Sequence, residues 1–343
     1  MRVALDAMGG DDAPRTTVEG AFAAAAEGVD VLLVGDEAVL DEEIKTRGGV
    51  VPNLHVRHAA EVVEMDDAPG AAFRSKKDSS VRVAFELVRN GQADAVVTMG
   101  NSGAALAAGM FACRRLEGVL RPAITALVPG LDRTVVLLDV GANTECKPEH
   151  LLQFGVMGAA LAGAAFGTGR PRVAVLANGA EADKGTDLTR AAAGLLRERA
   201  DIEFAGYIEP GDLLEGDVDV VVTDGWTGNM VLKTAEGVLG HTLGLLREAA
   251  ADGVAAKAGA ALMRRSLRRT FGRLKAGGAG GGLLLGIDAS AVIGHGGADA
   301  AATASAILFA DRLARADLPD RIREALRGSM SAPIGVVNAV PGK

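Results

Sequence analysis

Short apolar runs alternate with longer segments of helical periodicity along most of this 343-residue chain. Short apolar runs bounded by turn residues are typical of buried strands, whereas apolar positions three and four apart indicate helices. Strands are predicted at residues 3–5, 31–34, 54–57, 95–99, 124–128, 134–140, 172–177, 202–208 and 219–223. Helices are predicted at residues 14–27, 37–47, 80–90, 102–115, 149–166, 187–199, 228–251 and 298–316.

This alternation predicts an α/β protein, a three-layer α/β/α sandwich around a mainly parallel sheet. No repeat of fixed period and no linker divides the chain, so residues 1–343 are expected to form one unit, with room for two lobes. The glycine run at 277–282 predicts a flexible break. Residues 151–169 carry no charge, but they are rich in glycine and alanine and include Gln153, so they predict a buried helix rather than a membrane span.

Composition and charge narrow the function classes. The chain is 49% hydrophobic and 23% charged, which suits a soluble protein with a large core. Its net charge of −8 gives no support to nucleic-acid binding. The two cysteines, Cys113 and Cys146, lack the spacing of a disulfide framework or a metal site, so we expect a reducing cytosol and no metal. The first strand begins at residue 2 and Asp6 interrupts its apolar run, so no signal peptide is expected.

Glycine-containing polar turns follow several predicted strands. The first turn holds Asp6, Gly9, Gly10 and Asp11; it is acidic, and by itself it is typical of a capped strand-to-helix turn. Four similar turns follow later strands, at residues 99–104, 138–143, 223–229 and 293–297. Each is a weak signal alone, but ligands bind at the carboxyl ends of strands in such folds, so together they predict a polar cleft lined by backbone donors.

Cations lie near two comparable turns. Lys184 follows the segment 178–181, and residues 74–80 place Arg74, Lys76 and Lys77 directly before a helix. The second run fits either a solvated basic face or an anion site. The chain contains no G-x-G-x-x-G, Walker A, H-E-x-x-H or G-x-S-x-G sequence, so the common nucleotide, zinc and serine-hydrolase signatures are absent.

Taken in order, these segments resemble the bacterial PlsX-type phosphate acyltransferases. The resemblance extends over nearly the whole chain and is carried by residues 5–11, 76–80, 100–104, 138–143, 148–154, 225–229, 232–234 and 294–296. It implies that inorganic phosphate attacks the thioester of a long-chain acyl carrier protein, giving acyl phosphate and free carrier protein. It also implies a Rossmann-like fold of the kind found in isocitrate and isopropylmalate dehydrogenases.

The resemblance further implies where the protein works and with which partners. Enzymes of this type look like homodimers without a metal or organic cofactor. They are cytoplasmic and associate peripherally with the inner, anionic face of the membrane. Their acyl phosphate feeds phospholipid synthesis through a membrane glycerol-3-phosphate acyltransferase.

The chemistry suits the residues, because a phosphate dianion must be held without losing its nucleophilicity. Lys184 is expected to supply charge, Asn229 to bind phosphate or the oxyanion, and His295 to protonate the departing thiolate. The expected phosphate and oxyanion donors lie in the polar turns: Asn101, Ser102, Gly103, Asn143, Thr227 and Gly228. Supporting residues that orient their neighbours are Asp6, Gly9, Gly10, Asp11, Asp139, Asp224 and Lys233.

A covalent route is the alternative within the same reaction. Cys146 and His150 lie four residues apart, and a cysteine–histidine pair can accept an acyl group from a thioester. Phosphate is itself the nucleophile, however, so no acyl-enzyme is required, and a structural cysteine is the preferred interpretation.

A basic helix with no acidic residue is predicted between Lys257 and Lys275, within a region from residue 254 to the glycine run at 282. It fits a helix packed along one stripe and solvated on the other, or a contact with an anionic membrane or an acidic carrier protein. The resemblance favours the contact. The expected contact residues are Arg264, Arg265, Arg268, Arg269, Phe271 and Arg273.

Three other functions compete with this prediction. A decarboxylating dehydrogenase on a similar scaffold would need a nicotinamide site, and its fingerprint is missing. A short-chain phosphate acetyltransferase would use acyl-coenzyme A in place of carrier protein. The basic helix supports a third alternative, a non-enzymatic membrane scaffold, but this function would leave the polar turns unexplained.

Overall fold

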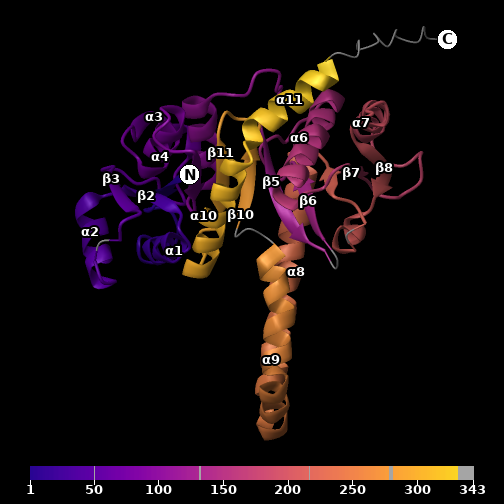
Figure 1. The fold of residues 1–343 in the computed structure, drawn as a ribbon. Helices are drawn as coiled ribbons and strands as arrows, with labels where there is room; N and C mark the ends of the chain where they lie inside the picture. Colours follow the sequence, from indigo (N-terminus) through magenta and orange to yellow (C-terminus); the bar gives the residue numbers. More distant parts are fainter. Residues whose placement is uncertain (50, 131–132, 216, 278–280, 331–343) are drawn as a thin grey trace, which may run out of the picture.

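A single sheet runs through the computed structural model, which describes residues 1–330 except 50, 131–132, 216 and 278–280; the side chains of 267–277 and 329–330 also lie outside the described part (Figure 1). The strand order is β3-β2-β1-β4-β11-β10-β5-β6-β9-β7-β8. The strands are β1 (Arg2–Asp6), β2 (Asp30–Gly35), β3 (Leu54–His58), β4 (Ala95–Thr98), β5 (Ala123–Pro129), β6 (Thr134–Leu138), β7 (Arg172–Leu176), β8 (Glu203–Ile208), β9 (Val220–Val222), β10 (Gly281–Leu285) and β11 (Ser290–Gly294).

Helices cover both faces of this sheet. They are α1 (Arg15–Ala26), α2 (Glu37–Thr46), α3 (Pro69–Ser75), α4 (Ser80–Arg89), α5 (Ser102–Ala108), α6 (Pro148–Phe166), α7 (Asp187–Arg197), α8 (Gly225–Ala251), α9 (Gly253–Gly277), α10 (Ala300–Arg315) and α11 (Leu318–Met330). A π-helical turn, η1 (Gly109–Cys113), follows α5, and a 3-10 turn, η2 (Pro210–Leu214), precedes β9. The α/β/α sandwich and the mainly parallel sheet predicted from the sequence are therefore confirmed.

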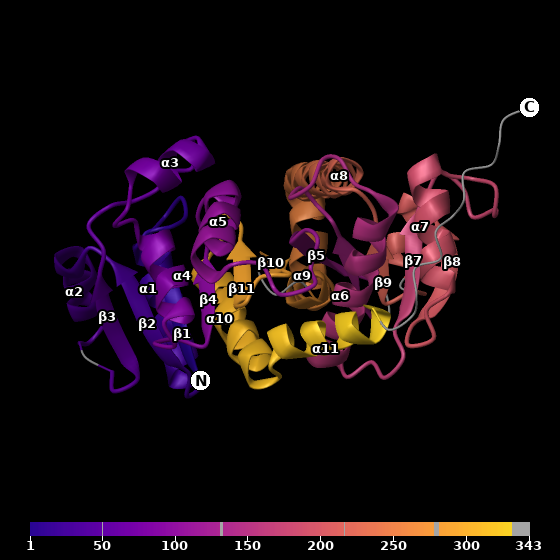
Figure 2. The ribbon, with the colours of Figure 1, turned by 90° about the horizontal axis from the view of Figure 1, so that it is seen from above.

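The strands divide the molecule into two lobes that lie side by side (Figure 2). The first lobe contains β1–β4 and β11, which run in one direction. The second lobe contains β6–β9, which are parallel to one another. Antiparallel pairs β11–β10, β10–β5 and β5–β6 join the lobes, so β6–β9 run opposite to the strands of the first lobe.

One apolar core extends across both lobes. On one face, Leu5 and Leu33 pack with residues of α1 and α10, and the same cluster continues through α6, α7 and α11. On the other face, the core divides. Phe85 of α4 lies with residues of α5 in one cluster, and Leu213 of η2 packs with β6, β7 and the start of α8 in another. The continuous core is what fixes the lobes relative to each other.

The glycine run was predicted to be a flexible break, and this prediction is wrong for its last residues. Gly281 and Gly282 belong to β10, which the sequence did not indicate. A Cβ added to Gly281 would come within 2.1 Å of the Ile293 carbonyl oxygen, and one on Gly282 within 2.1 Å of the Thr125 carbonyl oxygen. Glycine is thus required for close packing inside the sheet rather than for a loop. Residues 278–280 of the predicted break lie outside the described part.

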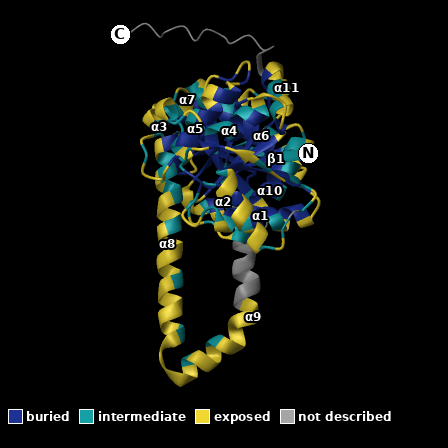
Figure 3. Ribbon diagram, turned by 90° about the vertical axis from the view of Figure 1, so that its left-hand side faces the viewer, coloured by how far each residue is buried: buried dark blue, intermediate teal, exposed yellow. Residues whose placement is uncertain are grey.

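Helices α8 and α9 form an arm that projects from the body (Figures 1 and 3). Beyond the body, α8 and α9 are mostly exposed, including apolar residues such as Val254 and Leu262, each 86% exposed. Arg264 and Arg265 of the predicted basic helix are exposed on α9, whereas the side chains of Arg268, Arg269, Phe271 and Arg273 lie outside the described part. No helix within the described residues is both long and apolar enough to cross a lipid bilayer.

Candidate functional site

The turns after β1, β4 and β11 contact one another in the first lobe. The hydroxyl of Thr98 donates to Asp6 Oδ2 at 2.7 Å, and the backbone N–H of Asp11 donates to the Gly296 carbonyl at 2.8 Å. A Cβ added to Gly9 would come within 2.8 Å of the Gly100 nitrogen. The candidate residues of the first lobe therefore come together from the ends of three strands.

Asn101 holds this group in place with its own side chain. Its Oδ1 accepts from the Ala104 N–H and caps α5, while its Nδ2 contacts the carbonyls of Glu64, Met65 and Asp67. Both ends of the amide are thus engaged by the protein. Next to it, the side chain of Ser102 is exposed, and Gly103 lies against Pro69.

Asp6 is a buried carboxylic acid at the centre of this group. It is 2% exposed, and its Oδ1 has no hydrogen-bond partner of normal geometry in the described part. Burial raises the pKa of Asp6, and the hydroxyls of Ser80 and Thr98 and the backbone of Met8 and Gly9 lower it in part. Because the folded state holds this proton more tightly, Asp6 contributes most to stability below pH 3.8, and the contribution falls as pH rises through the folded pKa.

Asp6→Asn is expected to remove this part of the pH dependence of stability, because asparagine keeps an acceptor for Thr98 and cannot ionise. The free energy of unfolding of both proteins should be measured in urea at pH 4.5 and pH 8. The wild-type value minus the variant value should decrease as the pH rises. A constant difference would show that Asp6 does not titrate differently in the folded and unfolded states.

In the second lobe, Asp139 organises the turn after β6. Its side chain is fully buried, and burial raises its pKa, while hydrogen bonds from Ala142, Asn143 and Ile124 oppose the rise. Its carboxylate accepts from five donors: the backbone N–H groups of Ile124, Gly141, Ala142 and Asn143, and the Asn143 side chain. Asp139 therefore fixes the orientation of the residues around it.

The start of α8 lies directly against this turn. The N–H of Gly225 donates to the Asn143 carbonyl at 2.7 Å, and a Cβ on Gly228 would come within 2.0 Å of the Asp139 carbonyl oxygen. Only glycine permits this approach. Asp224 caps the helix, accepting from both the N–H and the hydroxyl of Thr227.

Some candidate side chains of the second lobe use their hydrogen-bond donors within the protein, and one does not. The Asn143 amide donates to the Pro122 carbonyl and to Asp139, and the Thr227 hydroxyl donates to Asp224, so these donors are already used. The Asn229 side chain is half-buried, faces Gly141, and makes no hydrogen bond within the described residues. Asn229 therefore has a donor to offer a ligand.

Lys184 lies in the loop after β7. β7 is a parallel neighbour of β9, so this loop and the Asp224 turn lie at the same edge of the sheet. The Lys184 side chain is half-buried and packs over Gly179. The second-lobe group is therefore formed by the ends of β6, β7 and β9.

The turns of the first lobe and those of the second lobe do not meet at a common edge of the sheet, because β6 and β9 run opposite to β1 and β4. One face of α8 connects them. Asn229, Lys233 and Glu236 lie on this face at helical spacing, and Lys233 Nζ contacts Glu236 Oε2 at 2.9 Å. Glu236 Oε1 in turn lies 3.9 Å from His295 Nε2. Asn229 and Glu236 are about 10 Å apart along the helix.

Glu236 was not a candidate from the sequence. It lies in a segment with ordinary helical periodicity, and only its position seven residues after Asn229 could have indicated that the two share a helix face. Its contact with His295 joins residues 59 positions apart, which no local pattern reveals.

Cys146 and His150 do not form a nucleophile–base pair. Burial and, to a smaller extent, the nearby carboxylates of Asp139 and Asp224 raise the pKa of Cys146 to about 12. His150 Nδ1 accepts from the Lys147 N–H at 3.2 Å and caps α6, and burial lowers its pKa. The thiol is therefore protonated at neutral pH, and the histidine nitrogen is engaged elsewhere.

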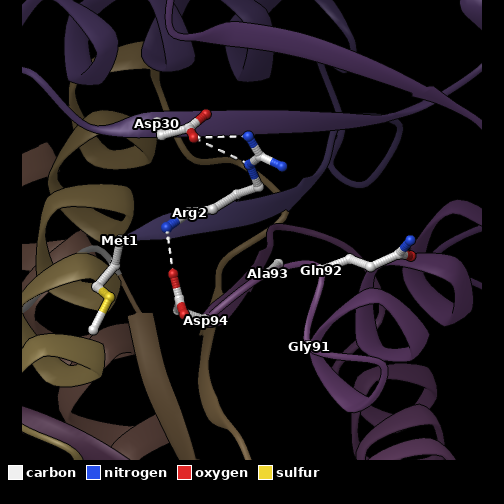
Figure 4. Close-up of a pocket in the computed structure, with 7 residues that line it drawn as sticks. All are labelled: Met1, Arg2, Asp30, Gly91, Gln92, Ala93 and Asp94. Carbon is white, nitrogen blue, oxygen red and sulfur yellow. Dashed lines mark hydrogen bonds and ion pairs between the residues drawn. The ribbon is translucent and has the colours of Figure 1, made fainter.

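Two hollows in the described surface lie away from the candidate residues. One, of about 310 Å³, lies where β1 and β4 begin, at the opposite ends of these strands from the polar turns (Figure 4). Within it, the Arg2 side chain donates to Asp30 and the Arg2 N–H donates to Asp94. The described residues hold no cluster of three or more acidic, histidine or cysteine side chains that could bind a metal.

Comparison with known proteins gives concordant results. Residues 1–321 match the family model described as "Fatty acid synthesis protein". The phosphate acyltransferase of Myxococcus xanthus is 53% identical over 86% of this chain and 85% of its own length. That of an Anaeromyxobacter species is 48% identical over 95% of this chain and 91% of its own. The EutD phosphotransacetylase from Staphylococcus aureus shares the fold, with a TM-score of 0.59 at 15% identity over 92% of this chain and 94% of its own.

Proposed function

The chain belongs to the fatty acid synthesis protein family and is an acyltransferase that acts on phosphate, and on that premise we propose that its acyl donor is a long-chain acyl carrier protein. The observation that carries this proposal is the identity of 53% and 48% to phosphate acyltransferases over most of the chain. The resulting acyl phosphate would serve phospholipid synthesis. The arrangement of the site supports the same chemistry.

The phosphate is proposed to bind at the second-lobe end of the α8 face. Asn229 offers an unused amide there, and the Lys184 loop lies at the same edge of the sheet. Asn143, Thr227 and Asn101 use their donors within the protein, so we assign them to holding the turns. A neutral amide and one ammonium can hold the dianion while leaving an oxygen free to attack.

His295 is proposed to act at the other end of the same face. In the reaction, the phosphate oxygen and the thioester sulfur lie on different sides of the carbonyl carbon. Anion donors at one end of α8 and a 66% exposed histidine at the other match this polarity. Asp139 and Asp6 maintain the two groups of turns.

The experiment that tests the proposal measures both products. Purified protein is incubated with palmitoyl carrier protein and phosphate, and free carrier thiol and hydroxylamine-sensitive acyl phosphate are quantified. Appearance of both, dependent on phosphate and absent with sulfate, is the expected result. Turnover only with acetyl-coenzyme A would favour the short-chain acetyltransferase, and no turnover with either donor would favour the scaffold.

Cys146→Ser is expected to retain wild-type kcat to within about twofold, because a thiol whose pKa is raised to about 12 is not the acyl acceptor. Steady-state kinetics and mass spectrometry of acid-quenched enzyme provide the measurement. Near-complete loss of activity, together with an acyl adduct on the wild-type protein, would revive the covalent route.

The arm formed by α8 and α9 is proposed to dock acidic carrier protein and the inner, anionic face of the membrane. Exposed apolar residues and the exposed Arg264 and Arg265 lie on it, and residues 253–277 contain no acid. A peripheral enzyme needs both apolar area and positive charge for this. We also propose that the protein is a homodimer. Its acyl phosphate is delivered to a membrane glycerol-3-phosphate acyltransferase.

Arg264→Glu combined with Arg265→Glu is expected to weaken binding to anionic vesicles by about 30-fold or more, since each basic residue near such a surface contributes about 1 kcal/mol and the new carboxylates are repelled by it. Carrier protein should also bind more weakly. Vesicle co-sedimentation and calorimetry measure the two affinities. The control, Arg15→Glu combined with Lys45→Glu, makes the same charge change away from the arm and should bind normally. Equal losses in both proteins would show that net charge, not the arm, is responsible.

A further inference from the structure

Glu236 occupies the point at which the arm leaves the body. It is 38% exposed, and the helix residues that follow it are mostly exposed. Its two carboxylate oxygens face in different directions along the molecule: Oε2 contacts Lys233 on the same helix at 2.9 Å, and Oε1 faces His295 Nε2 at 3.9 Å. The contact with His295 connects α8 with the histidine turn of the first lobe.

We propose that Glu236 is a positioning residue for acyl transfer, which holds the His295 imidazole by its Nε2 edge and favours the protonated ring that gives its proton to the departing sulfur. This inference rests on the proposed function. A carboxylate behind a histidine fixes the orientation and tautomer of the ring, so that the other nitrogen, Nδ1, faces the reacting group. Lys233 keeps the Glu236 carboxylate in place through its ion pair.

The proton balance of the step follows from this arrangement. An unprotonated oxygen of hydrogen phosphate forms a bond to the carbonyl carbon. The carbon–sulfur bond then breaks, and a proton passes from Nδ1 of the protonated imidazole to the departing sulfur. The acyl hydrogen phosphate releases its proton to water and the imidazole takes one back from water, so acyl phosphate and the carrier thiol are formed with no other reactant consumed.

The charges around His295 are consistent with a single carboxylate partner. On α8 the facing groups are Glu236 and Lys233. On the β1 turn, Asp11 lies next to Gly296, where a Cβ would come within 2.8 Å of its Oδ1. Nε2 is within ion-pair distance of Glu236. The pair is partly exposed, so its effect on the rate should be moderate.

A double-mutant cycle tests the proposal. Glu236→Gln should lower kcat about fivefold with little change in KM, and His295→Ala should lower kcat about 10²-fold or more. In the His295→Ala background, Glu236→Gln should have no further effect, because the glutamate acts through the histidine. A multiplicative effect of the two substitutions would overturn the proposal.

A second donor separates positioning from a structural effect. An aryl thioester of palmitate releases a thiolate that needs no proton, so Glu236→Gln and wild type should use it at the same rate. An equal loss with both donors would overturn the inference. Glu42→Gln, the same substitution at an exposed site on α2, is the control. If wild-type protein turns over and His295→Ala is fully active, the inference fails while the proposed function stands.

Discussion

Asn229→Ala is expected to lower kcat by about 10²–10³-fold while the fold remains intact, which is the typical consequence of losing one preorganised donor at a developing charge. The Asn229 amide is half-buried, makes no hydrogen bond within the described residues, and faces the turn that Asp139 holds. Steady-state kinetics with palmitoyl carrier protein, combined with a thermal unfolding curve, is the measurement.

The matched control is Asn90→Ala, which removes the same side chain from an exposed position at the end of α4. It should leave kcat unchanged. Lys184→Ala extends the test, because Lys184 is the proposed charge at the same edge of the sheet. If both Asn229→Ala and Lys184→Ala turned over normally, the phosphate site would have to lie elsewhere.

Asp139→Ala is expected to lower the free energy of unfolding by about 3–5 kcal/mol, because it leaves several buried donors without a partner. Five donors converge on this carboxylate, and four of them belong to the backbone. The turn also supports the start of α8, so activity should be lost as well. Urea unfolding at neutral pH provides the measurement.

Asp36→Ala is the comparison, since Asp36 caps α2 on the surface by accepting from the N–H groups of Ala38 and Val39. Asp36→Ala should lower the free energy of unfolding by about 1 kcal/mol. A similar cost for both substitutions would mean that the buried turn rearranges and that Asp139 does not organise it.

The strands were predictable wherever an apolar run ends in a polar turn. β2, β4 and β9 are such cases, because Val31–Val34 and comparable runs are buried on both faces of the sheet. β10 was missed because its first residues are glycines, which usually indicate a loop, and here the need for glycine arises from two neighbouring strands. α11 and β11 were also missed. Close packing between distant segments leaves no local pattern.

The sequence could predict which residue types form the site. It could not predict which of these side chains hydrogen-bond within the protein and which are available to a ligand. Asn101, Asn143 and Asn229 look alike in their glycine-containing turns. Only the structure shows that the side-chain amides of Asn101 and Asn143 donate to backbone carbonyls. The Asn229 amide makes no hydrogen bond within the described part. The opposite directions of the two lobes also depend on three antiparallel pairings. The sequence indicated the alternation of strands and helices but not this reversal.

The position of β10 and β11 has a consequence for how the chain folds as it is synthesised. These two strands, at residues 281–294, insert between β4 and β5, which precede them by more than 150 residues. Until they emerge from the ribosome, β4 and β5 each present an open sheet edge, the kind of surface that pairs wrongly with other chains. Closure of the sheet is therefore a late, non-local event, and such topologies fold slowly and are exposed to aggregation while they do so.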